Sequence, residues 1–487
     1  MKIVEKNTEQ NLLIVSNRLP FKIEKTGNRF VLKETDGGLV TAIKSLIEGK
    51  SLNRIDKIKW IGSANFNQRD WETHKELFAD NKIEVHPVFL NKKIEKEFYH
   101  GFSNSVIWPL FHYFPSYVEF LEKYYASYEY VNKVYSEAIG GIAGGNDIIW
   151  VHDYHFMLLP GYLRSNRIQN KLGFFLHIPF PSFELFRLLP EKWRKDILAS
   201  MLASDLLGFQ TADYAAHFKE CFHKTNFILS EAEKNECGEK IKDYPISIDF
   251  DRFDKSYNKK GVVHLRNTLK DLYKNRKIIF SVDRLDYTKG VMNRLEAFEE
   301  LLAEHPAYLG KVSFILNVVP SRDEISKYKE RKRMIEESIG RINGKFGNIN
   351  WQPIVYQYRH LTFNQLLSFY TSCQVALVTP LRDGMNLVAK EFVASRQDEL
   401  GVLVLSDMAG AACVLKDAIT VTPTDIKKMK ECIIQALEMP LQEQAERMKR
   451  MREEVKTNDV ARWAANYLGD LKTNKSETKH GTKVLVI

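Results

Sequence analysis

The stretch Thr379–Glu391 reads TPLRDGMNLVAKE, and the residues around it indicate the fold class. A short apolar run, Val375–Val378, precedes it and favours a buried strand of a parallel sheet. Leu387 and Glu391 are spaced so that they share one face of a helix, and Asn386 is a candidate for the helix cap. A strand, a tight turn and a helix start in this order predict a βα unit of an α/β fold.

The turn Asp383–Met385 is the part of this unit that can meet a ligand. Gly384 lets the backbone approach a bound group closely. The helix start beside it aims unpaired N–H groups and the positive end of the helix dipole at the space above the sheet, which suits a diphosphate. Glu391 lies about one turn along the helix and can accept hydrogen bonds from sugar hydroxyls. An ordinary βα turn has the same spacing, so the spacing alone leaves both interpretations open.

Composition places the chain among ordinary globular proteins. Of its 487 residues, 44% are hydrophobic and 27% are charged, which suits two large α/β domains or three average ones. The net charge is +9, but basic and acidic residues alternate, as in EISKYKERKRMIEE at 324–337. Such segments are typical of solvated helix faces, so we expect no nucleic-acid partner.

Neither a membrane segment nor a secretory signal is predicted. No apolar run approaches the roughly 18 residues of a membrane span, and the N-terminal MKIVEKNTEQN has no apolar core. The five cysteines are scattered and form no CxxC pair, which fits reduced, buried thiols better than disulfides or a zinc site. We therefore expect a cytoplasmic protein with no membrane partner.

The βα pattern recurs along the chain. Apolar runs predict further strands at Leu12–Val15, Asp147–Val151, Leu172–Leu176, Leu206–Phe209, Lys277–Val282, Val312–Val319 and Gly401–Ser406. Apolar residues at i, i+3, i+4, i+7, i+8 and i+11 predict a final amphipathic helix through Val460, Trp463, Ala464, Tyr467, Leu468 and Leu471.

Polar side chains follow several of these strands. Arg18 lies where the first strand meets its loop, the usual ligand edge of an open α/β sheet, although a solvated surface arginine is the commoner case. Arg284 and Lys289 follow another strand, where they are either surface charges or cations for a departing diphosphate. A third group contains residue types that can bind a metal, although their spacing matches no zinc signature. Its members are His152, Asp153, His155 and His177.

RDGMNLVAKE closely resembles the nucleotide-sugar site of the trehalose-6-phosphate synthases, which are retaining glycosyltransferases. The resemblance runs from about Leu12 to Leu471 and continues through SNRLP at Ser16, DGGLV at Asp36, WVHDYH at Trp150, FFLHIPFP at Phe174 and VDRLDYTKG at Val282. So many separate motifs in the order of the family make the resemblance specific.

The resemblance implies the GT-B fold, an α/β architecture in which two Rossmann-like domains face each other across a cleft and a C-terminal helix crosses back to the first domain. We expect an acceptor-binding domain over residues 1–247 and a nucleotide-sugar-binding domain over residues 248–454. The crossing helix is expected at residues 455–471, and residues 472–487 are expected to be a frayed tail.

The implied reaction is glucosyl transfer with retention from UDP-glucose to glucose 6-phosphate, giving α,α-trehalose 6-phosphate and UDP, the first step of trehalose biosynthesis. The resemblance implies a front-face route in which the leaving phosphate oxygen takes the acceptor proton. The expected partners are these two small molecules, with no metal or other cofactor, because Arg284, Lys289 and the helix start near Asn386 would hold the charge of the diphosphate. The residues leave open the nucleotide base, a homo-oligomer, a separate trehalose-phosphate phosphatase, and whether the chain is a piece of a synthase–phosphatase fusion.

The resemblance also implies roles for individual residues. The residues implied in catalysis are Asp153, His177, Arg284 and Lys289. The acceptor is expected to meet Arg18, Tyr99, Trp108, Asp153 and Arg322, with both arginines at its phosphate. The donor is expected to meet Gly37, Gly38, His177, Arg284, Lys289, Leu361, Asp383, Gly384, Met385, Asn386, Leu387, Val388 and Glu391.

Two residues depart from the family pattern. Ser63 and Asn65 stand where relatives carry a tryptophan and a glycine, which leaves the shape of this loop and the choice of acceptor open. One alternative is therefore a relative with another acceptor or donor, such as a glucosylglycerol-phosphate synthase or a pseudo-glycosyltransferase. Another is a non-catalytic sugar-phosphate sensor. The triplet Asp249–Asp251 matches a metal motif of a different glycosyltransferase fold, and we assign it no metal role.

Overall fold

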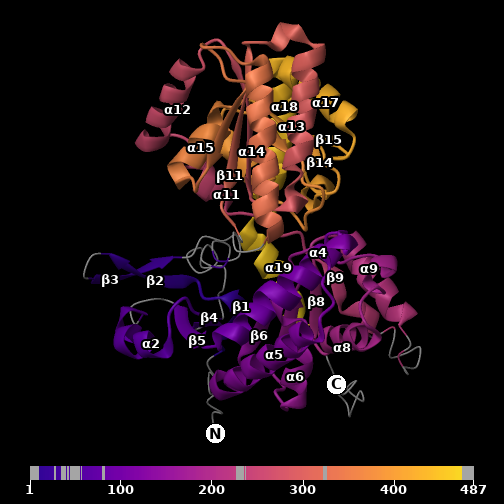
Figure 1. The fold of residues 1–487 in the computed structure, drawn as a ribbon. Coiled ribbons are helices and arrows are strands. Elements are labelled where there is room, and N and C mark those ends of the chain that lie inside the picture. Colours follow the sequence, from indigo (N-terminus) through magenta and orange to yellow (C-terminus); the bar gives the residue numbers. More distant parts are fainter. Residues whose placement is uncertain are drawn as a thin grey trace. The chain divides into compact units, whose positions relative to one another are not determined.

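The computed structural model of the chain describes residues 10–473, apart from residues 27–28, 35–39, 41–42, 44–54, 56, 79–82, 226, 228–234, 236 and 322–325. The described residues form two compact units (Figure 1). The first unit runs to Tyr244 and resumes at Trp463, and the second unit is Pro245–Arg462. Each unit contains its own parallel sheet with helices around it. The α/β class predicted from the sequence is therefore confirmed.

The first unit is built on a seven-stranded sheet with the order β5-β4-β1-β6-β7-β8-β9. Every neighbouring pair in it is parallel. Its strands are β1 (Leu12–Arg18), β4 (Ile58–Ser63), β5 (Ile83–Val88), β6 (Ile148–His152), β7 (Leu172–Phe175), β8 (Leu206–Phe209) and β9 (Ile241–Asp243). After β1, the strands β2 (Phe21–Thr26) and β3 (Arg29–Glu34) form an antiparallel hairpin.

Helices of the first unit connect these strands. They are α2 (Gln68–His74), α3 (Lys92–Lys96), the π-helix η2 (Glu97–Ile107), α4 (Trp108–Phe111), α5 (Glu122–Ile142), α6 (Leu159–Ser165), α7 (Phe183–Phe186), α8 (Glu191–Leu202) and α9 (Ala212–Lys224). Short 3₁₀ turns are η1 (Lys75–Phe78), η3 (Pro115–Tyr117) and η4 (Tyr154–Phe156). The motif DGGLV that begins at Asp36 lies largely outside the described residues.

The last helix, α19 (Val460–Thr473), packs on the sheet of the first unit. The Tyr467 ring stacks on Trp150 with centroids 4.9 Å apart, and its hydroxyl lies 3.1 Å from the carbonyl oxygens of Phe174 and Leu206. All six apolar positions used to predict the helix are buried. The amphipathic pattern therefore identified both the helix and its buried face.

The second unit is built on a six-stranded sheet with the order β12-β11-β10-β13-β14-β15, again with parallel neighbours. Its strands are β10 (Lys277–Arg284), β11 (Val312–Val319), β12 (Ile354–Tyr358), β13 (Val375–Val378), β14 (Val402–Ser406) and β15 (Ile419–Val421). In this order the first strand of the unit, β10, lies in the middle of the sheet, as in a Rossmann-like arrangement.

Helices of the second unit form two groups in contact with the sheet. One group is α13 (Val291–Glu304), α14 (Ser326–Phe346) and α17 (Ile426–Glu438). The other is α11 (Phe250–Asp254), α12 (Lys260–Leu272), α15 (Phe363–Ser372), α16 (Leu387–Ser395) and α18 (Leu441–Thr457). The 3₁₀ turns η5 (Tyr287–Lys289), η6 (Pro306–Tyr308) and η7 (Gly410–Cys413) complete the unit.

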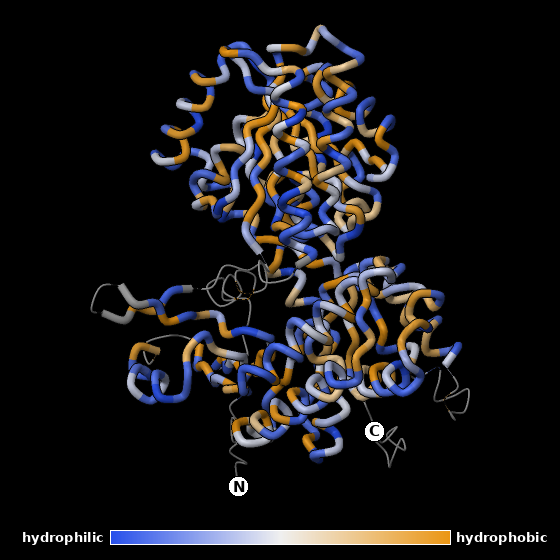
Figure 2. Tube along the Cα trace, viewed as in Figure 1, coloured by the Kyte–Doolittle hydropathy of each residue, from blue (hydrophilic) through white to orange (hydrophobic). Residues whose placement is uncertain are grey.

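Hydrophobic residues concentrate along the central strands of each unit, while the outer helices are mixed (Figure 2). The runs that predicted the strands are buried except at the half-buried Lys277 and Val319, and every residue of β13 and β14 is buried. None of the described helices combines the length and the apolar character that a membrane span requires. Continuous apolar runs were therefore the right signal for parallel strands covered on both faces.

Several strand bounds were predicted with errors of one to three residues, and strands β1 and β10 both extend further than predicted. The apolar run suggested that the strand ends at Val282, whereas β10 continues to Arg284, pairing Asp283 with Val318 of β11. A carboxylate can stay in the buried strand because Asp283 is paired with the buried Arg294 at 2.6 Å.

The expectation of buried thiols holds for three of the five cysteines, because Cys237 is half-buried and Cys413 is exposed. The side chains of Cys221, Cys373 and Cys432 are buried, whereas Cys413 is exposed. Cys413 is the last residue of the short turn η7, which faces it toward solvent instead of the core.

A buried lysine ties helix α16 to the segment that opens the second unit. Lys390 is 1% exposed, and its ammonium donates to the carbonyl oxygen of Ile246 at 2.7 Å. Burial lowers the pKa of Lys390 to about 7, although the charge of Glu454 acts in the opposite direction. The charge state of this contact therefore changes near neutral pH.

We expect Lys390→Met to remove a pH-dependent part of the folding free energy. Because the folded-state pKa lies below that of a free lysine, the unfolded chain binds more protons above pH 7, and wild-type stability rises with pH. The gain between pH 6 and pH 9 is roughly 2–3 kcal/mol. Urea unfolding at several pH values measures it, with the exposed Lys416→Met as the control. Equal slopes in wild type and Lys390→Met would contradict the prediction.

Candidate active site

The turn from Asp383 to Asn386 joins strand β13 to helix α16 in the second unit. Asn386 adopts φ 77° and ψ 89°, a left-handed conformation that asparagine tolerates. Its side chain accepts a hydrogen bond from the Ala389 N–H at 3.2 Å, so the predicted helix cap is confirmed. The residues of α16 that remain half-buried are Leu387, Val388 and Glu391.

Backbone contacts hold this turn against the segment that follows β14. The Ala411 N–H donates to the Met385 carbonyl at 2.7 Å, and the Gly410 N–H donates to the Asp383 carbonyl at 3.3 Å. A Cβ added to Gly410 would lie 2.1 Å from the Gly384 carbonyl oxygen. The two backbones therefore touch at a place where only glycine fits.

A lysine from the neighbouring strand loop reaches the same turn. Lys289 is 8% exposed and pairs with the Asp383 carboxylate at 2.6 Å, which also accepts a bond from the Asn386 amide at 3.1 Å. Arg284, the last residue of β10, is exposed. A buried cation, an exposed cation and a helix start thus gather where the adjacent strands β10 and β13 end. This is a fitting environment for an anion.

Glu391 is oriented by a buried tyrosine. The Tyr370 hydroxyl donates to Glu391 Oε2 at 3.0 Å. Burial raises the pKa of Glu391, and this hydrogen bond opposes the rise. Leu361 directly precedes Thr362, which caps α15, the helix that carries Tyr370. One carboxylate oxygen of Glu391, Oε2, therefore accepts the hydrogen bond from Tyr370, and Oε1 takes no part in this hydrogen bond.

In the first unit, Arg18 lies over an aromatic pair. Its guanidinium carbon is 5.4 Å from the centroid of the Tyr99 ring, and Tyr99 stacks on His155 at 5.8 Å with 6° between the planes. Tyr99 belongs to the π-helix η2, where the Asn104 amide donates to the Tyr99 carbonyl at 2.7 Å. The wide helical turns thus bring an aromatic side chain from a helix to a strand end.

Trp108 starts helix α4 and is buried. Its ring lies 5.7 Å from Tyr154, which directly follows Asp153, and 4.1 Å from His112. The Tyr154 hydroxyl donates to Asn104 at 3.1 Å. Trp108 therefore packs against Tyr154 in the loop after β6, and the hydrogen bond from Tyr154 to Asn104 connects this loop to η2.

Asp153 and His177 meet at the ends of the adjacent strands β6 and β7. Asp153 has φ 76°, and its Oδ1 accepts the His177 N–H at 3.3 Å. The His177 ring lies between the Gln210 amide at 3.3 Å and His152 Nδ1 at 3.1 Å. Burial lowers the pKa of His177 to about 3. The imidazole is therefore neutral at physiological pH, and both of its ring nitrogens are in contact with protein side chains.

Three of the predicted site residues, Gly37, Gly38 and Arg322, lie outside the described residues. The others are divided between the two units, and some of them are in contact in pairs. In the first unit Arg18 contacts Tyr99, and Asp153 contacts His177. In the second unit Asp383 contacts Lys289.

The sequence model of glycosyltransferase family 20 matches residues 10–473. The chain belongs to glycosyltransferase family 20. It is 42% identical over 481 residues to the bifunctional trehalose-6-phosphate synthase/phosphatase of Thermoproteus tenax. The match covers 97% of this chain but 65% of that relative, so the chain spans just under two thirds of the relative's length.

Solved structures of similar proteins cover nearly the whole chain. One is an alpha,alpha-trehalose-phosphate synthase (UDP-forming) from Burkholderia xenovorans in complex with glucose-6-phosphate, with a TM-score of 0.82, 31% identity, and coverage of 95% of this chain and 100% of that one. Another is described as "Trehalose-6-phosphate from E. coli bound with UDP-2-fluoro glucose", with a TM-score of 0.83, 33% identity, and coverage of 95% and 99%. The two parallel sheets and these likenesses establish the GT-B fold for the family 20 chain.

Sequence reasoning did not identify three residues that support the site. Gln210 bonds His177, Tyr370 bonds Glu391, and Arg294 bonds Asp283. Arg294 had a detectable signal, because it interrupts the apolar face of α13 between Val291 and Leu295. A charge on a buried helix face predicts a buried partner.

No group of three or more His, Cys, Asp or Glu side chains in the described part of the chain is arranged to hold a metal ion. The D-x-D triplet has structural partners: Asp249 accepts the Arg252 N–H at 2.9 Å as the cap of α11, and Asp251 pairs with Lys255 at 2.5 Å. The reaction's independence of metal stays a prediction.

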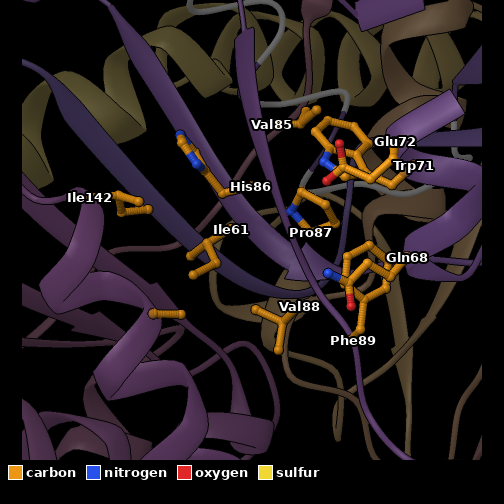
Figure 3. Close-up of a pocket in the computed structure, with 11 residues that line it drawn as sticks. Ile61, Gln68, Trp71, Glu72, Val85, His86, Pro87, Val88, Phe89 and Ile142 are labelled. Carbon is orange, nitrogen blue, oxygen red and sulfur yellow. The ribbon is translucent and has the colours of Figure 1, made fainter. Parts of the chain in front are cut away.

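A cavity of about 280 Å³ lies beside the edge strand β5 of the first unit (Figure 3). Its lining comes from β4, β5, the segment after β5, α2 and α5, and includes Trp71, His86 and Ile142. None of the predicted site residues lines it. The cavity therefore gives no support to the predicted site and does not contradict it.

We expect Gly410→Ala to distort the turn at Asp383–Met385. The new methyl group would overlap the Gly384 carbonyl, so one backbone must move. Overpacking of this kind costs about 1–3 kcal/mol of stability, and the affinity for a nucleoside diphosphate should fall. Thermal unfolding and UDP calorimetry measure the two effects.

Gly340→Ala is the matched control, because Gly340 lies in α14 with no atom within 4 Å of its added Cβ. This substitution should leave UDP affinity unchanged and stabilise the helix by up to about 1 kcal/mol. Unchanged UDP affinity in Gly410→Ala would show that the turn does not contact the donor.

Proposed function

We propose that this family 20 glycosyltransferase transfers glucose from UDP-glucose to glucose 6-phosphate with retention, giving α,α-trehalose 6-phosphate and UDP. The observation that carries the proposal is the anion environment of the second unit, where Lys289 lies 2.6 Å from Asp383 beside the helix start at Asn386. The ligands named for the Burkholderia xenovorans and E. coli relatives support the same pair of substrates.

In the proposal the donor uses the second unit. The diphosphate binds at the start of α16 and at Arg284 and Lys289, which hold the charge that develops on the leaving group. Asp383 and the backbone of Gly384–Asn386 meet the sugar. Glu391, oriented by Tyr370, accepts hydrogen bonds from ribose hydroxyls. Leu361, just before α15, contributes backbone contacts to the base.

The acceptor uses the first unit. Arg18 binds the phosphate with its planar guanidinium, and Tyr99 supplies a ring face and a hydroxyl. Trp108 lines the acceptor pocket together with Tyr99, and Asp153 accepts hydrogen bonds from the sugar. The neutral His177 contacts the donor sugar. The roles of Gly37 and Gly38 at the donor and of Arg322 at the acceptor phosphate remain part of the proposal.

The proposed glucosyl transfer depends on the positions of the two reactants and on the positive charge around the leaving diphosphate. The acceptor hydroxyl attacks the anomeric carbon on the face that the leaving diphosphate occupies, and a phosphate oxygen takes the hydroxyl proton. The protein then needs no carboxylate nucleophile. It must hold the two reactants together and stabilise the leaving diphosphate, which positioned cations do well in a site that excludes water.

Ser63 and Asn65 support a second candidate, a relative with another acceptor. The Ser63 hydroxyl donates to the Asn17 carbonyl at 2.5 Å, directly before Arg18. The Asn65 amide bonds both backbone groups of Ile23 in the β2 strand. These contacts shape the chain on both sides of Arg18, where the proposed acceptor phosphate binds.

One experiment tests the proposal and the alternative together. The purified protein is incubated with UDP-, GDP- and ADP-glucose and with glucose 6-phosphate, glycerol 3-phosphate and glucose as acceptors, and the products are identified by NMR. We expect α,α-trehalose 6-phosphate from UDP-glucose and glucose 6-phosphate. A product only from glycerol 3-phosphate would establish the second candidate, and no product from any pair would favour a non-catalytic sensor.

We expect Arg284→Ala to slow glucosyl transfer by roughly 10²–10³-fold, the cost of about 2.7–4 kcal/mol for a lost transition-state donor. The substitution should leave stability nearly unchanged because Arg284 is exposed. Arg276→Ala, directly before the first residue of the same strand, is the control. Near-wild-type turnover of Arg284→Ala would refute its role at the diphosphate.

Transfer should survive removal of divalent metal. Lys289, Arg284 and the helix start supply the positive charge that a metal supplies in other enzymes. Exhaustive EDTA treatment followed by dialysis should therefore leave kcat unchanged. Activity that disappears and returns with Mn²⁺ would require a metal site.

Arg18→Ala should selectively impair use of the phosphorylated acceptor. A lost charge-assisted hydrogen bond is worth roughly a 10- to 150-fold drop in kcat/KM for glucose 6-phosphate. UDP affinity should stay unchanged, and the preference for glucose 6-phosphate over glucose should shrink. The exposed Arg69→Ala in α2 is the control. An unchanged acceptor preference in Arg18→Ala would mean that the phosphate binds elsewhere.

A further inference from the structure

Arg294 is a fully buried arginine that none of the proposed roles uses. It lies in the first turn of α13 and has an exposed fraction of 0%. Its guanidinium pairs with the Asp283 carboxylate at 2.6 Å and contacts the Ser281 hydroxyl, so two of its partners are on β10. A charge removed from water this completely needs several hydrogen-bond partners to be tolerated.

The remaining partners of Arg294 are backbone carbonyls at the candidate donor site. One guanidinium nitrogen donates to the carbonyl of Lys289, the lysine that pairs with Asp383. Another lies 3.3 Å from the carbonyl of Leu377 in β13, the strand that leads into the donor turn. One side chain thus joins β10, the loop after β10 and β13.

The loops after β10 and β13 also contact each other. The Leu381 N–H donates to the Thr288 carbonyl at 2.7 Å. Gly290 has φ 67°, and a Cβ added there would lie 2.4 Å from the Thr379 carbonyl oxygen. The two loops therefore share a tight backbone contact, and Arg294 fixes the strand or loop backbone on both sides of it.

We propose that Arg294 is a positioning residue for the donor diphosphate, because its guanidinium fixes the Lys289 backbone and thereby the place of the lysine ammonium. The inference rests on the proposed function. Arg294 never touches the donor and acts through Lys289 and the shared loop contact. Its planar fork reaches a carboxylate, a hydroxyl and two carbonyls at once. A lysine offers a single nitrogen and cannot keep all four.

The simpler explanation is that Arg294 only stabilises the fold. A second arginine with similar partners serves as a control that distinguishes this explanation from the positioning role. Arg164 of the first unit has the same kind of partners: the Asp205 carboxylate at 3.1 Å and the carbonyls of Ala203, Ile168 and Asn170. It approaches the starts of strands β7 and β8, at the edge of the sheet opposite to Asp153 and His177. Replacing it should destabilise the fold without affecting the donor.

The experiment compares Arg294→Lys and Arg294→Met with Arg164→Lys and Arg164→Met in the full chain. Each variant is characterised by its Tm, by calorimetric Kd for UDP, and by KM and kcat for both substrates. We expect both pairs to lower Tm. Only the Arg294 variants should raise the Kd for UDP, at least tenfold, with the same direction in KM for UDP-glucose. The KM for glucose 6-phosphate should stay within twofold of wild type.

Asp283→Asn keeps the test decisive if the Arg294 variants do not fold, because asparagine still accepts a hydrogen bond from Arg294. It should raise the Kd for UDP at least threefold. Folded variants of Arg294 or Asp283 with wild-type affinity for UDP would overturn the positioning role. A wild-type chain that binds no UDP and transfers no glucose would instead overturn the proposed function, so the two failures are distinct.

Discussion

The parallel register of the second sheet is the constraint on which the candidate donor site depends. Ile279 and Phe280 of β10 pair with Val375 and Ala376 of β13, so both strands end at the same edge, side by side. The loops that follow must therefore share that edge, and Lys289 from one reaches Asp383 from the other at 2.6 Å. Residues 94 positions apart in sequence become neighbours because parallel strands share one direction.

The same geometry acts independently in the first unit. Strands β1, β6 and β7 are consecutive in the sheet, so the polar residues at their ends emerge together. The left-handed conformation of Asp153 turns its carboxylate to the His177 N–H. A strained backbone at a strand end is costly and persists only where neighbouring contacts determine it, and the Asp153 N–H is itself held by the Phe175 carbonyl at 2.8 Å.

Sequence reasoning succeeded where the determinant is local. Apolar runs identified the strands, the capping residue Asn386 identified a helix start, and the strand ends identified candidate residues. It failed where the determinant is a distant partner. Asp283 extends β10 only because Arg294 neutralises it, and Arg294 is placed by contacts such as the Leu377 carbonyl, 83 residues away. Hydrophobic periodicity carries no information about such pairs. Gln210 and Tyr370 were missed for the same reason, since each is recognisable only by what it touches.

A buried ion pair such as Asp283–Arg294 usually contributes little net stability, because removing two charges from water offsets their attraction. Well-packed apolar residues of the same size would serve the core of the second unit as well. They could not hold the Lys289 carbonyl, which needs a donor on the buried side of the loop. The ion pair is therefore better explained by the position that it gives to the Lys289 backbone than by a contribution to the stability of the second unit. A leaving diphosphate gains most from cations that are already in place when its charge develops, since no reorganisation is then needed during the reaction. In the proposal the buried guanidinium of Arg294 fixes the Lys289 backbone and thereby the position of the lysine ammonium at the diphosphate.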